Sequence, residues 1–189
     1  MFRSVFAVLV AASALPAAAQ DYRAAMAQFH AASIAGWAAD PVLIDAIRAQ
    51  NAVTSGYSRE QIAALDAAWQ AETGSAEQPT ISLALRNAAA DFLRGQVLAA
   101  QGRITEVIVM DAAGLNVAVT SATSDLWQGD EEKYLRTYAI GPGAVHFSAI
   151  EYDDSTGQYQ GQISFSVVDP ANGELIGAMS VGVDAQAIL

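Results

Sequence analysis

The densest group of side chains able to bind a ligand lies in one short stretch, Ser124–Tyr134, called here the aromatic–acidic segment. Its aromatic rings can close on an organic molecule or stack over a cation. Its carboxylates accept hydrogen bonds from an ammonium group, and its amide both donates and accepts. The sequence therefore predicts a site for a small polar or cationic molecule, with the candidate residues Asp125, Trp127, Gln128, Asp130 and Tyr134.

The same residues also have a purely structural interpretation. Trp127 can pack as a cover on the core, and Asp130–Glu132 can form the first turn of a short helix, where carboxylates interact favourably with the helix dipole. A cation site is a further alternative, because aspartate oxygens are ligands that calcium accepts; the candidates are Asp125, Asp130, Asp153 and Asp154. The sequence contains no twelve-residue calcium loop, so we predict no metal site.

Motifs for catalysis are absent from the sequence. The two histidines, His30 and His146, lie in no catalytic motif, and neither Gly-x-Ser-x-Gly nor His-Glu-x-x-His occurs. The absence of cysteine excludes thiol catalysis, thiolate zinc sites and iron–sulfur clusters. A carboxylate pair such as Asp125 and Asp130 could perform acid–base chemistry, which leaves a carboxylate-dependent hydrolase as an alternative. We expect a protein that is not an enzyme and that needs no cofactor.

The charge balance restricts the partners. The chain has 20 acidic residues against 9 basic ones, a net charge of −11 at pH 7. Such a surface repels phosphate backbones and anionic lipids. We therefore expect no binding to nucleic acid and none to membrane surfaces.

The first nineteen residues have the pattern of a secretory signal peptide. Arg3 supplies the positive charge, Val5–Leu15 is the apolar run, and Ala17–Ala19 is the small-residue cleavage site. The run is too short to span a bilayer, although a retained anchor is the alternative. We expect residues 1–19 to be cleaved, leaving a periplasmic chain that does not insert into the membrane. The remaining ~170 residues suit a single domain.

Residues 20–102 have the periodicity of helices. A helix is predicted over Asp21–Ala39, with a buried stripe that includes Trp37, and a second one begins at Asp40-Pro41. Ser58–Gln61 is a capping box for a third helix. A fourth helix is predicted from Thr80, as its cap, to a point near Gly102.

Residues 103–189 alternate with the period of strands. Tight turns separate five predicted strands, which are Ile104–Met110, Leu115–Thr120, Ala144–Tyr152, Tyr159–Asp169 and Leu175–Val183. Helices followed by strands predict an α+β fold, in which N-terminal helices pack on a five-stranded antiparallel sheet. The residues expected to be buried between the two layers are Trp37, Phe92, Ile108, Phe165 and Met179. One polar strand face either lines a pocket or meets water; it consists of Gln160, Gln162, Ser164 and Ser166.

Three stretches resemble the Cache (PAS-like) family of extracytoplasmic sensor domains: Ile34–Asn51, Glu106–Thr120 and Glu151–Val183. The third is the most specific, because an acidic-Ser-Thr-Gly turn, an Asp-x-x-Asn-Gly turn and a last strand of small residues occur together. The resemblance covers nearly all of the chain after the signal peptide with a single sheet. It implies a single-Cache domain, whose helical part is residues 20–102 and whose sheet part is residues 103–189.

The resemblance also implies where a ligand binds. In Cache domains the region after the second strand lines the pocket, and Tyr152 with Asp154 matches an aromatic–acidic pair on the far wall. Amino-acid sensors of the family use an arginine here, and the spacing of Arg136 to Trp127 does not match theirs, so an amino-acid ligand is not supported. The expected function is periplasmic binding of a small polar or cationic molecule on behalf of a membrane-bound receptor, kinase or transporter. A protein-interaction module without a small ligand is the alternative.

Overall fold

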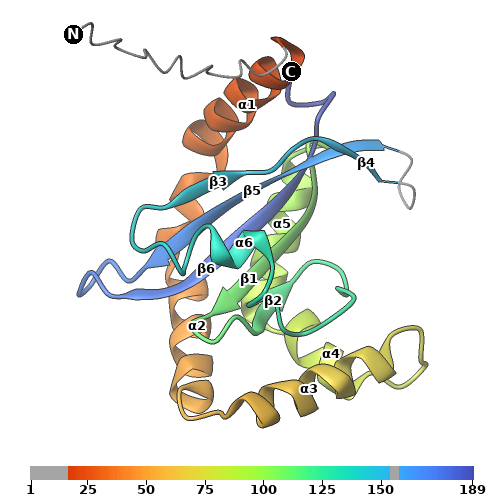
Figure 1. Cartoon of the computed structure of the whole chain (residues 1–189), viewed down its shortest axis with the longest axis vertical. Coiled ribbons are helices and arrows are strands. Elements are labelled where there is room, and N and C mark those ends of the chain that lie inside the picture. Colours follow the sequence, from red (N-terminus) through yellow and green to blue (C-terminus); the bar gives the residue numbers. More distant parts are fainter. Residues whose placement is uncertain (1–16, 154–157) are drawn as a thin grey trace, which may run out of the picture.

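The structure, a computed structural model, describes residues 17–153 and 158–189 (Figure 1). Its helices, in chain order, are α1 (Ala17–Phe29), the π-helical turn η1 (His30–Ile34), the 3₁₀ turn η2 (Ala35–Ala39), α2 (Pro41–Thr54), α3 (Arg59–Glu72), α4 (Pro79–Leu85), α5 (Ala88–Ala99) and α6 (Glu132–Leu135). Its strands are β1 (Ile104–Asp111), β2 (Asn116–Val119), β3 (Val145–Phe147), β4 (Glu151–Asp153), β5 (Gln158–Val168) and β6 (Leu175–Asp184). Residues 1–16 of the expected signal peptide, and the candidate Asp154, lie outside the described residues.

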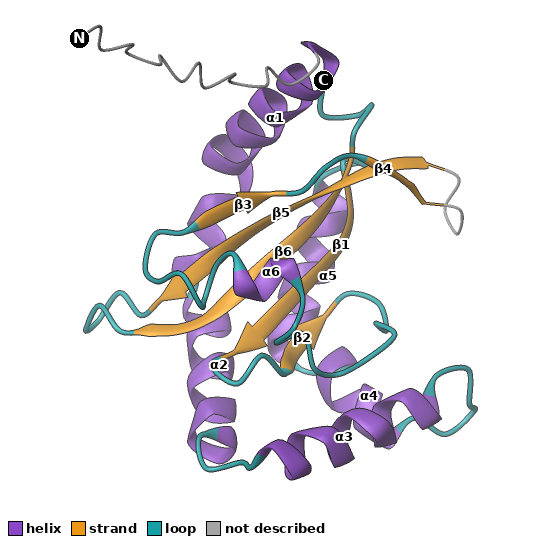
Figure 2. Ribbon diagram, viewed as in Figure 1, coloured by secondary structure: helices purple, strands orange, loops and turns teal. Residues whose placement is uncertain are grey.

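The strands form one antiparallel sheet in the order β2-β1-β6-β5-β3, and β4 also pairs with β5 (Figure 2). The predicted α+β architecture is confirmed, but the sheet has six strands, not five. The predicted strand Ala144–Tyr152 is broken between β3 and β4. At the break the hydroxyl of Ser148 accepts the backbone N–H of Gln162 at 2.8 Å, so a side chain replaces a carbonyl in the ladder.

Two predicted helix starts are confirmed in detail. The Asp40 carboxylate accepts the N–H of Val42 at 3.0 Å, with Pro41 at the first helical position of α2. At the start of α3 the Ser58 hydroxyl accepts the N–H of Gln61, whose side-chain oxygen accepts the N–H of Ser58 at 2.8 Å. Along the described parts of the chain, no helix combines the length and the apolar character needed to cross a membrane.

Two other helix predictions are wrong in detail. The helix expected over Asp21–Ala39 changes from α to π geometry at His30 and then to 3₁₀ geometry. A π turn advances by one extra residue, and the buried position that follows Phe29 is accordingly Ile34 and not Ser33, which is exposed. The buried stripe therefore does not continue along the predicted face.

The helix expected from Thr80 to Gly102 is two helices, and Thr80 is not its cap. α4 begins one residue earlier, with Pro79 at the first helical position. It ends before Asn87, whose side-chain oxygen accepts the N–H of Ala90 at 2.8 Å and so caps α5. An asparagine inside a helical periodicity thus marks a break, because its short side chain satisfies backbone donors at a helix start.

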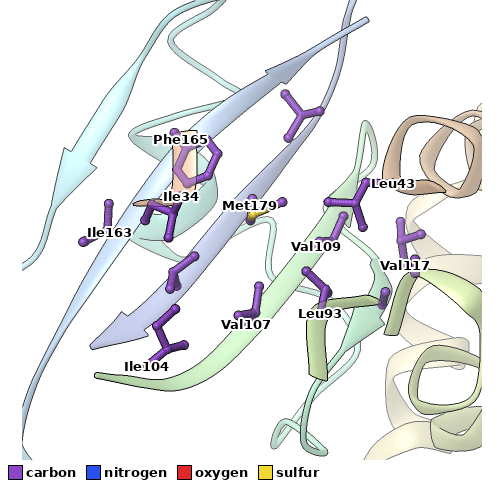
Figure 3. Packing of buried hydrophobic residues seen from close by; sticks show 14 of the residues in the cluster. Ile34, Leu43, Leu93, Ile104, Val107, Val109, Val117, Ile163, Phe165 and Met179 are labelled. Carbon is purple, nitrogen blue, oxygen red and sulfur yellow. The ribbon is translucent and has the colours of Figure 1, made fainter. Parts of the chain in front are cut away.

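The core lies on both faces of the sheet. Helices α1, α2 and α5 cover one face, where Phe165 and Met179 are buried as predicted (Figure 3). Trp37 and Phe92 are only partly buried against this cluster, contrary to expectation. Ile108 is buried on the other face, with Trp69 of α3, because neighbouring residues of a strand point to opposite sides.

Candidate functional site

The aromatic–acidic segment follows β2 and returns along the outer edge of that strand. The backbone N–H of Asn116 donates to the carbonyl of Leu126 at 3.0 Å, and that of Gln128 donates to the carbonyl of Gly114 at 2.8 Å. Leu115 and Trp127 form an antiparallel bridge. The segment therefore occupies backbone groups that an edge strand would otherwise expose.

Three of its polar side chains bond to one another. Gln128 is fully buried, and its amide N–H₂ donates to the Asp125 carboxylate at 2.6 Å. Its amide oxygen accepts from the Lys133 ammonium at 2.9 Å. Lys133, the one lysine of the sequence, also forms an ion pair with Glu131 at 2.9 Å. Two of the expected ligand residues, Asp125 and Gln128, are therefore hydrogen-bonded to other side chains of the segment.

The two aromatic candidates anchor the segment to the β1–β2 turn. The indole N–H of Trp127 donates to the carbonyl of Ala113 at 3.0 Å, and the hydroxyl of Tyr134 donates to that of Ala112 at 2.7 Å. The Tyr134 ring stacks on Tyr138, with centroids 5.1 Å apart. Burial raises the pKa of Tyr134 far above its ordinary value, with smaller contributions from Tyr138 and Asp111, so the hydroxyl stays a neutral donor.

Asp66 of α3 also holds the segment, and sequence reasoning missed it. One carboxylate oxygen accepts the backbone N–H groups of Leu126 at 2.8 Å and Trp127 at 3.0 Å. The other accepts the side-chain N–H of Gln70 at 2.7 Å. Asp66 lies within a regular helical pattern about sixty residues earlier in the chain, where no local signal distinguishes it from a solvated helix residue.

A first hollow, the α3 hollow, lies between α3 and the segment and has a volume of about 560 Å³. It brings together two candidates, the half-buried Trp127 and the exposed Asp130. Its other lining residues come from α3 and are Arg59, Ile62, Ala63, Asp66, Ala67 and Gln70.

A second hollow, the sheet hollow, lies over the first half of β5 and has a volume of about 530 Å³. It contains the candidate Tyr152, which is 53% exposed and packs edge-to-face on Tyr159 with centroids 5.2 Å apart. The structure therefore separates Tyr152 from Trp127 and Asp130. The full lining is Glu106, Glu132, Ser148, Ala149, Glu151, Tyr152, Gln160, Gly161 and Gln162.

The polar strand face, left open by the sequence, divides between a hollow lining and positions that hydrogen-bond within the protein. Gln160 and Gln162 line the sheet hollow. Ser164 is fully buried, with its hydroxyl 2.9 Å from that of Ser180 on β6. Ser166 donates to the carbonyl of Gly141 at 2.7 Å, which ties the loop after α6 to the sheet.

Three carboxylates from three different elements give the sheet hollow its charge. Glu106 comes from β1 and accepts from the Gln162 amide at 3.4 Å. Glu132 comes from α6 and lies 3.6 Å from His146 and 3.5 Å from Arg136, and Glu151 is exposed on β4. Glu106 is the one charged residue of the predicted strand Ile104–Met110, and this was the available sequence signal for the hollow.

These carboxylates do not form a metal cage. Across residues 17–153 and 158–189, no three histidine, aspartate or glutamate side chains are arranged so that they could hold a metal ion. The hollow therefore offers dispersed acceptors around a volume of small-molecule size. His30, the other histidine, is half-buried and packs edge-to-face on Phe165 at 4.8 Å between centroids, and burial lowers its pKa.

Comparison with known proteins gives matches among solved structures alone. No family model matches the chain, and no curated protein does. The sensor domain of the histidine kinase DctB of V. cholerae is 15% identical, with a TM-score of 0.39, over 89% of this chain and 57% of that one. The ligand-binding domain of the Campylobacter jejuni chemoreceptor Tlp3, in complex with 4-methylisoleucine, is 13% identical, with a TM-score of 0.41, over 88% and 61%.

An extracellular ligand binding receptor from Desulfohalobium retbaense is 17% identical, with a TM-score of 0.39, over 78% of this chain and 25% of that one. The matching structures are Cache-type extracellular sensor domains, the family that the sequence resembles. The chain spans between about a quarter and three-fifths of the length of these three structures.

Proposed function

We propose that this chain is an exported, sensor-type domain that binds a small organic cation in the sheet hollow. The observation that carries the proposal is the set of three carboxylates, Glu106, Glu132 and Glu151, around a hollow of about 530 Å³. The net charge of −11 adds a long-range attraction for cations.

The lining suits an ammonium group on an organic body better than a metal ion. An ammonium needs several acceptors at hydrogen-bond distance, which carboxylate, amide and hydroxyl oxygens supply. The exposed Tyr152 ring offers a face for a cation–π contact. Because Glu132 already lies near Arg136 and His146, Glu151 is the carboxylate expected to contribute most to binding.

The α3 hollow is the alternative place for the same ligand. Trp127 would supply the flat wall and Asp130 the charge. Asp125, Gln128 and Tyr134 would then act indirectly, by holding the segment that carries both residues.

A titration with spermidine, choline and glycerol tests the proposal and decides between the hollows. A ligand at a hundred times its dissociation constant stabilises the folded state by about 2.7 kcal/mol, so one of the two cations should raise the melting temperature and glycerol should not. Glu151→Gln and Tyr152→Ala should each weaken binding about tenfold, the effect of about 1.4 kcal/mol. The exposed Glu77→Gln, on the α3–α4 loop, is the matched control and should bind normally.

The opposite pattern would move the site. Weakened binding in Asp130→Asn and Trp127→Ala, with normal binding in Glu151→Gln, places the ligand in the α3 hollow. Stabilisation by neither cation contradicts the proposed ligand class, and stabilisation by a partner protein alone favours the interaction module. Turnover of a compound by the purified protein would favour the hydrolase.

The location and the partner are part of the same proposal. We propose that residues 1–19 are removed on export to the periplasm and that the loaded domain acts on a membrane-bound receptor, kinase or transporter. The mass of the exported protein should correspond to an N-terminus at Gln20 or Asp21. An exported form that retains Met1 would contradict cleavage.

A further inference from the structure

Glu132, one of the carboxylates that line the sheet hollow, has two basic neighbours. It begins α6, which lies over the sheet in contact with β5 and β6 (Figure 1). Its Oε1 lies 3.5 Å from the guanidinium of Arg136, and its Oε2 lies 3.6 Å from Nε2 of His146 on β3. A guanidinium keeps its charge in proteins, whereas an imidazole is charged only when both of its nitrogens carry a proton. One oxygen of Glu132 therefore faces a permanent cation, and the other faces a group that can become one.

His146 lies on the face of the sheet that carries the hollow. Its partner across β5 is Ser164, and opposite residues of an antiparallel pair point to the same side. Ser164 follows the lining residue Gln162 by two positions, so these two side chains also share a face. Ser164 is uncharged, and its hydroxyl is engaged with that of Ser180. A proton taken up by His146 therefore places its charge beside the hollow.

The charged groups around His146 come from three elements. α6 supplies Glu132 and Arg136, and β1 supplies Glu106 to the wall of the same hollow. α1 places the guanidinium of Arg23 over the Phe147 ring, and Phe147 points to the opposite side of β3 from His146. On the hollow side, the group that meets His146 within ion-pair distance is therefore the carboxylate of Glu132.

We propose that His146 makes cation binding in the sheet hollow depend on pH, an inference that rests on the proposed function. With a neutral imidazole, Glu132 has one oxygen beside Arg136 and the other available to a ligand. Histidine takes up its proton between about pH 5 and pH 8, and the imidazolium then pairs with that second oxygen. Its charge also repels a cation in the hollow. Both effects have the same sign, so acid weakens binding.

The coupling acts in both directions, because two ligands of one protein change each other's affinity by the same factor. A cation in the hollow disfavours the proton on His146, so binding at pH 6.0 should release a fraction of a proton. Calorimetric titration of the unmodified protein with spermidine, in two buffers of different ionisation enthalpy, measures this release. Equal heats in the two buffers would contradict the proposal, and this measurement needs no variant to fold.

Titrations with spermidine and with choline at pH 7.5 and pH 5.5 measure the effect on affinity. Both values lie above about pH 4.3, the ordinary value for glutamate, so histidine is the side chain that ordinarily titrates between them. The unmodified protein should bind the cation about three- to fivefold more weakly at pH 5.5, the upper range for exposed ion pairs. His146→Gln should bind within about twofold of the unmodified protein at pH 7.5 and should lose this dependence.

His30→Gln is the matched control, because His30 is the other histidine of the sequence and packs on Phe165 in the core. It should keep the full pH dependence of binding. A dependence that persists in His146→Gln, or that His30→Gln abolishes, overturns the role of His146.

Two further outcomes separate this inference from the proposed function. Equal affinity at the two pH values, with binding of a cation intact, contradicts the inference alone. Absence of binding by both cations at pH 7.5 overturns the cation site and this inference with it.

Discussion

The aromatic–acidic segment and the sheet hollow contain similar kinds of side chain but use them differently. In the segment, the amide of Gln128 joins Asp125 to Lys133, and the indole of Trp127 bonds to the β1–β2 turn. In the sheet hollow, the carboxylates of Glu132 and Glu151 are exposed beside an open volume. The side chains of the segment are close neighbours in the sequence, whereas the hollow is lined by residues of β1, α6, β4 and β5.

This difference indicates that polar side chains close together in the sequence tend to form hydrogen bonds with one another. A loop that covers the edge of a sheet buries its own donors and acceptors, and buried polar groups need partners. Neighbours in the chain are the nearest partners available. In the sheet hollow, Glu132 and Glu151 come from α6 and β4 and are exposed, so a ligand can reach them.

The largest loss of stability is expected for a substitution in the core, and the losses in the segment and the sheet hollow can be compared with it. Phe165 is 4% exposed beneath α1 and η1. Phe165→Ala should lower the free energy of unfolding by about 3–5 kcal/mol, the usual loss for a deleted core aromatic ring. A denaturant melt measures it, and an unchanged midpoint would contradict the assignment of β5.

Within the segment, Gln128→Leu should lower the free energy of unfolding by about 3 kcal/mol. The change removes hydrogen bonds to two charged groups, Asp125 and Lys133, each worth about 1.5–3 kcal/mol. Gln28→Leu, at an exposed glutamine of α1, is the control and should change stability by less than about 0.5 kcal/mol. Equal melts of the two variants would show that the buried network does not support the segment.

A matched pair of aromatic variants compares the two regions directly. Trp127→Ala should lower the stability of the ligand-free protein by about 2 kcal/mol, roughly half the value for a fully buried ring, because the indole is half-buried and hydrogen-bonded. Tyr152→Ala should change stability by less than about 0.5 kcal/mol, since the ring is 53% exposed. Thermal melts without ligand measure both, and a reversed order would assign the structural role to the sheet hollow.

The smallest effect concerns pH and lies outside both regions. Burial lowers the pKa of His30 from its ordinary 6.5, so the folded state holds the neutral imidazole against the rings of Phe147 and Phe165. The unfolded state takes up a proton near pH 6.5 and the folded state does so only at lower pH. This contribution to stability is therefore constant above pH 6.5 and is lost as the pH falls toward the lowered pKa.

His30→Gln removes the titrating group. The difference in denaturant midpoint between the two proteins should stay constant from pH 8 to pH 7 and should change below about pH 6.5, in the direction that makes the variant less sensitive to acid. A difference that does not vary with pH would contradict a lowered pKa.

Local signals in the sequence predicted much of the fold. The Asp40 cap with Pro41 and the capping box of Ser58 and Gln61 were predicted correctly, because each is a contact between residues two or three positions apart. The change of period near Gly102 predicted helices before it and antiparallel strands after it. The single-face periodicity of β5 likewise predicted that Phe165 is buried.

Tertiary contacts decided the rest. The strand breaks at Ser148 because its hydroxyl meets Gln162 on β5. Ile108 lies in a second buried cluster with Trp69 of α3 and Ile81 of α4, and these distant partners are not revealed by a strand period.

The same reason applies to the candidate ligand residues. The sequence by itself determined which of them can donate, accept or stack, since these are properties of the side chains. Only the tertiary structure decided that Tyr152 and Glu106 share a hollow while Trp127 and Asp66 share another. A side chain's partners depend on which distant residues the packing brings within about 3 Å of it, and that proximity is not encoded in local spacing.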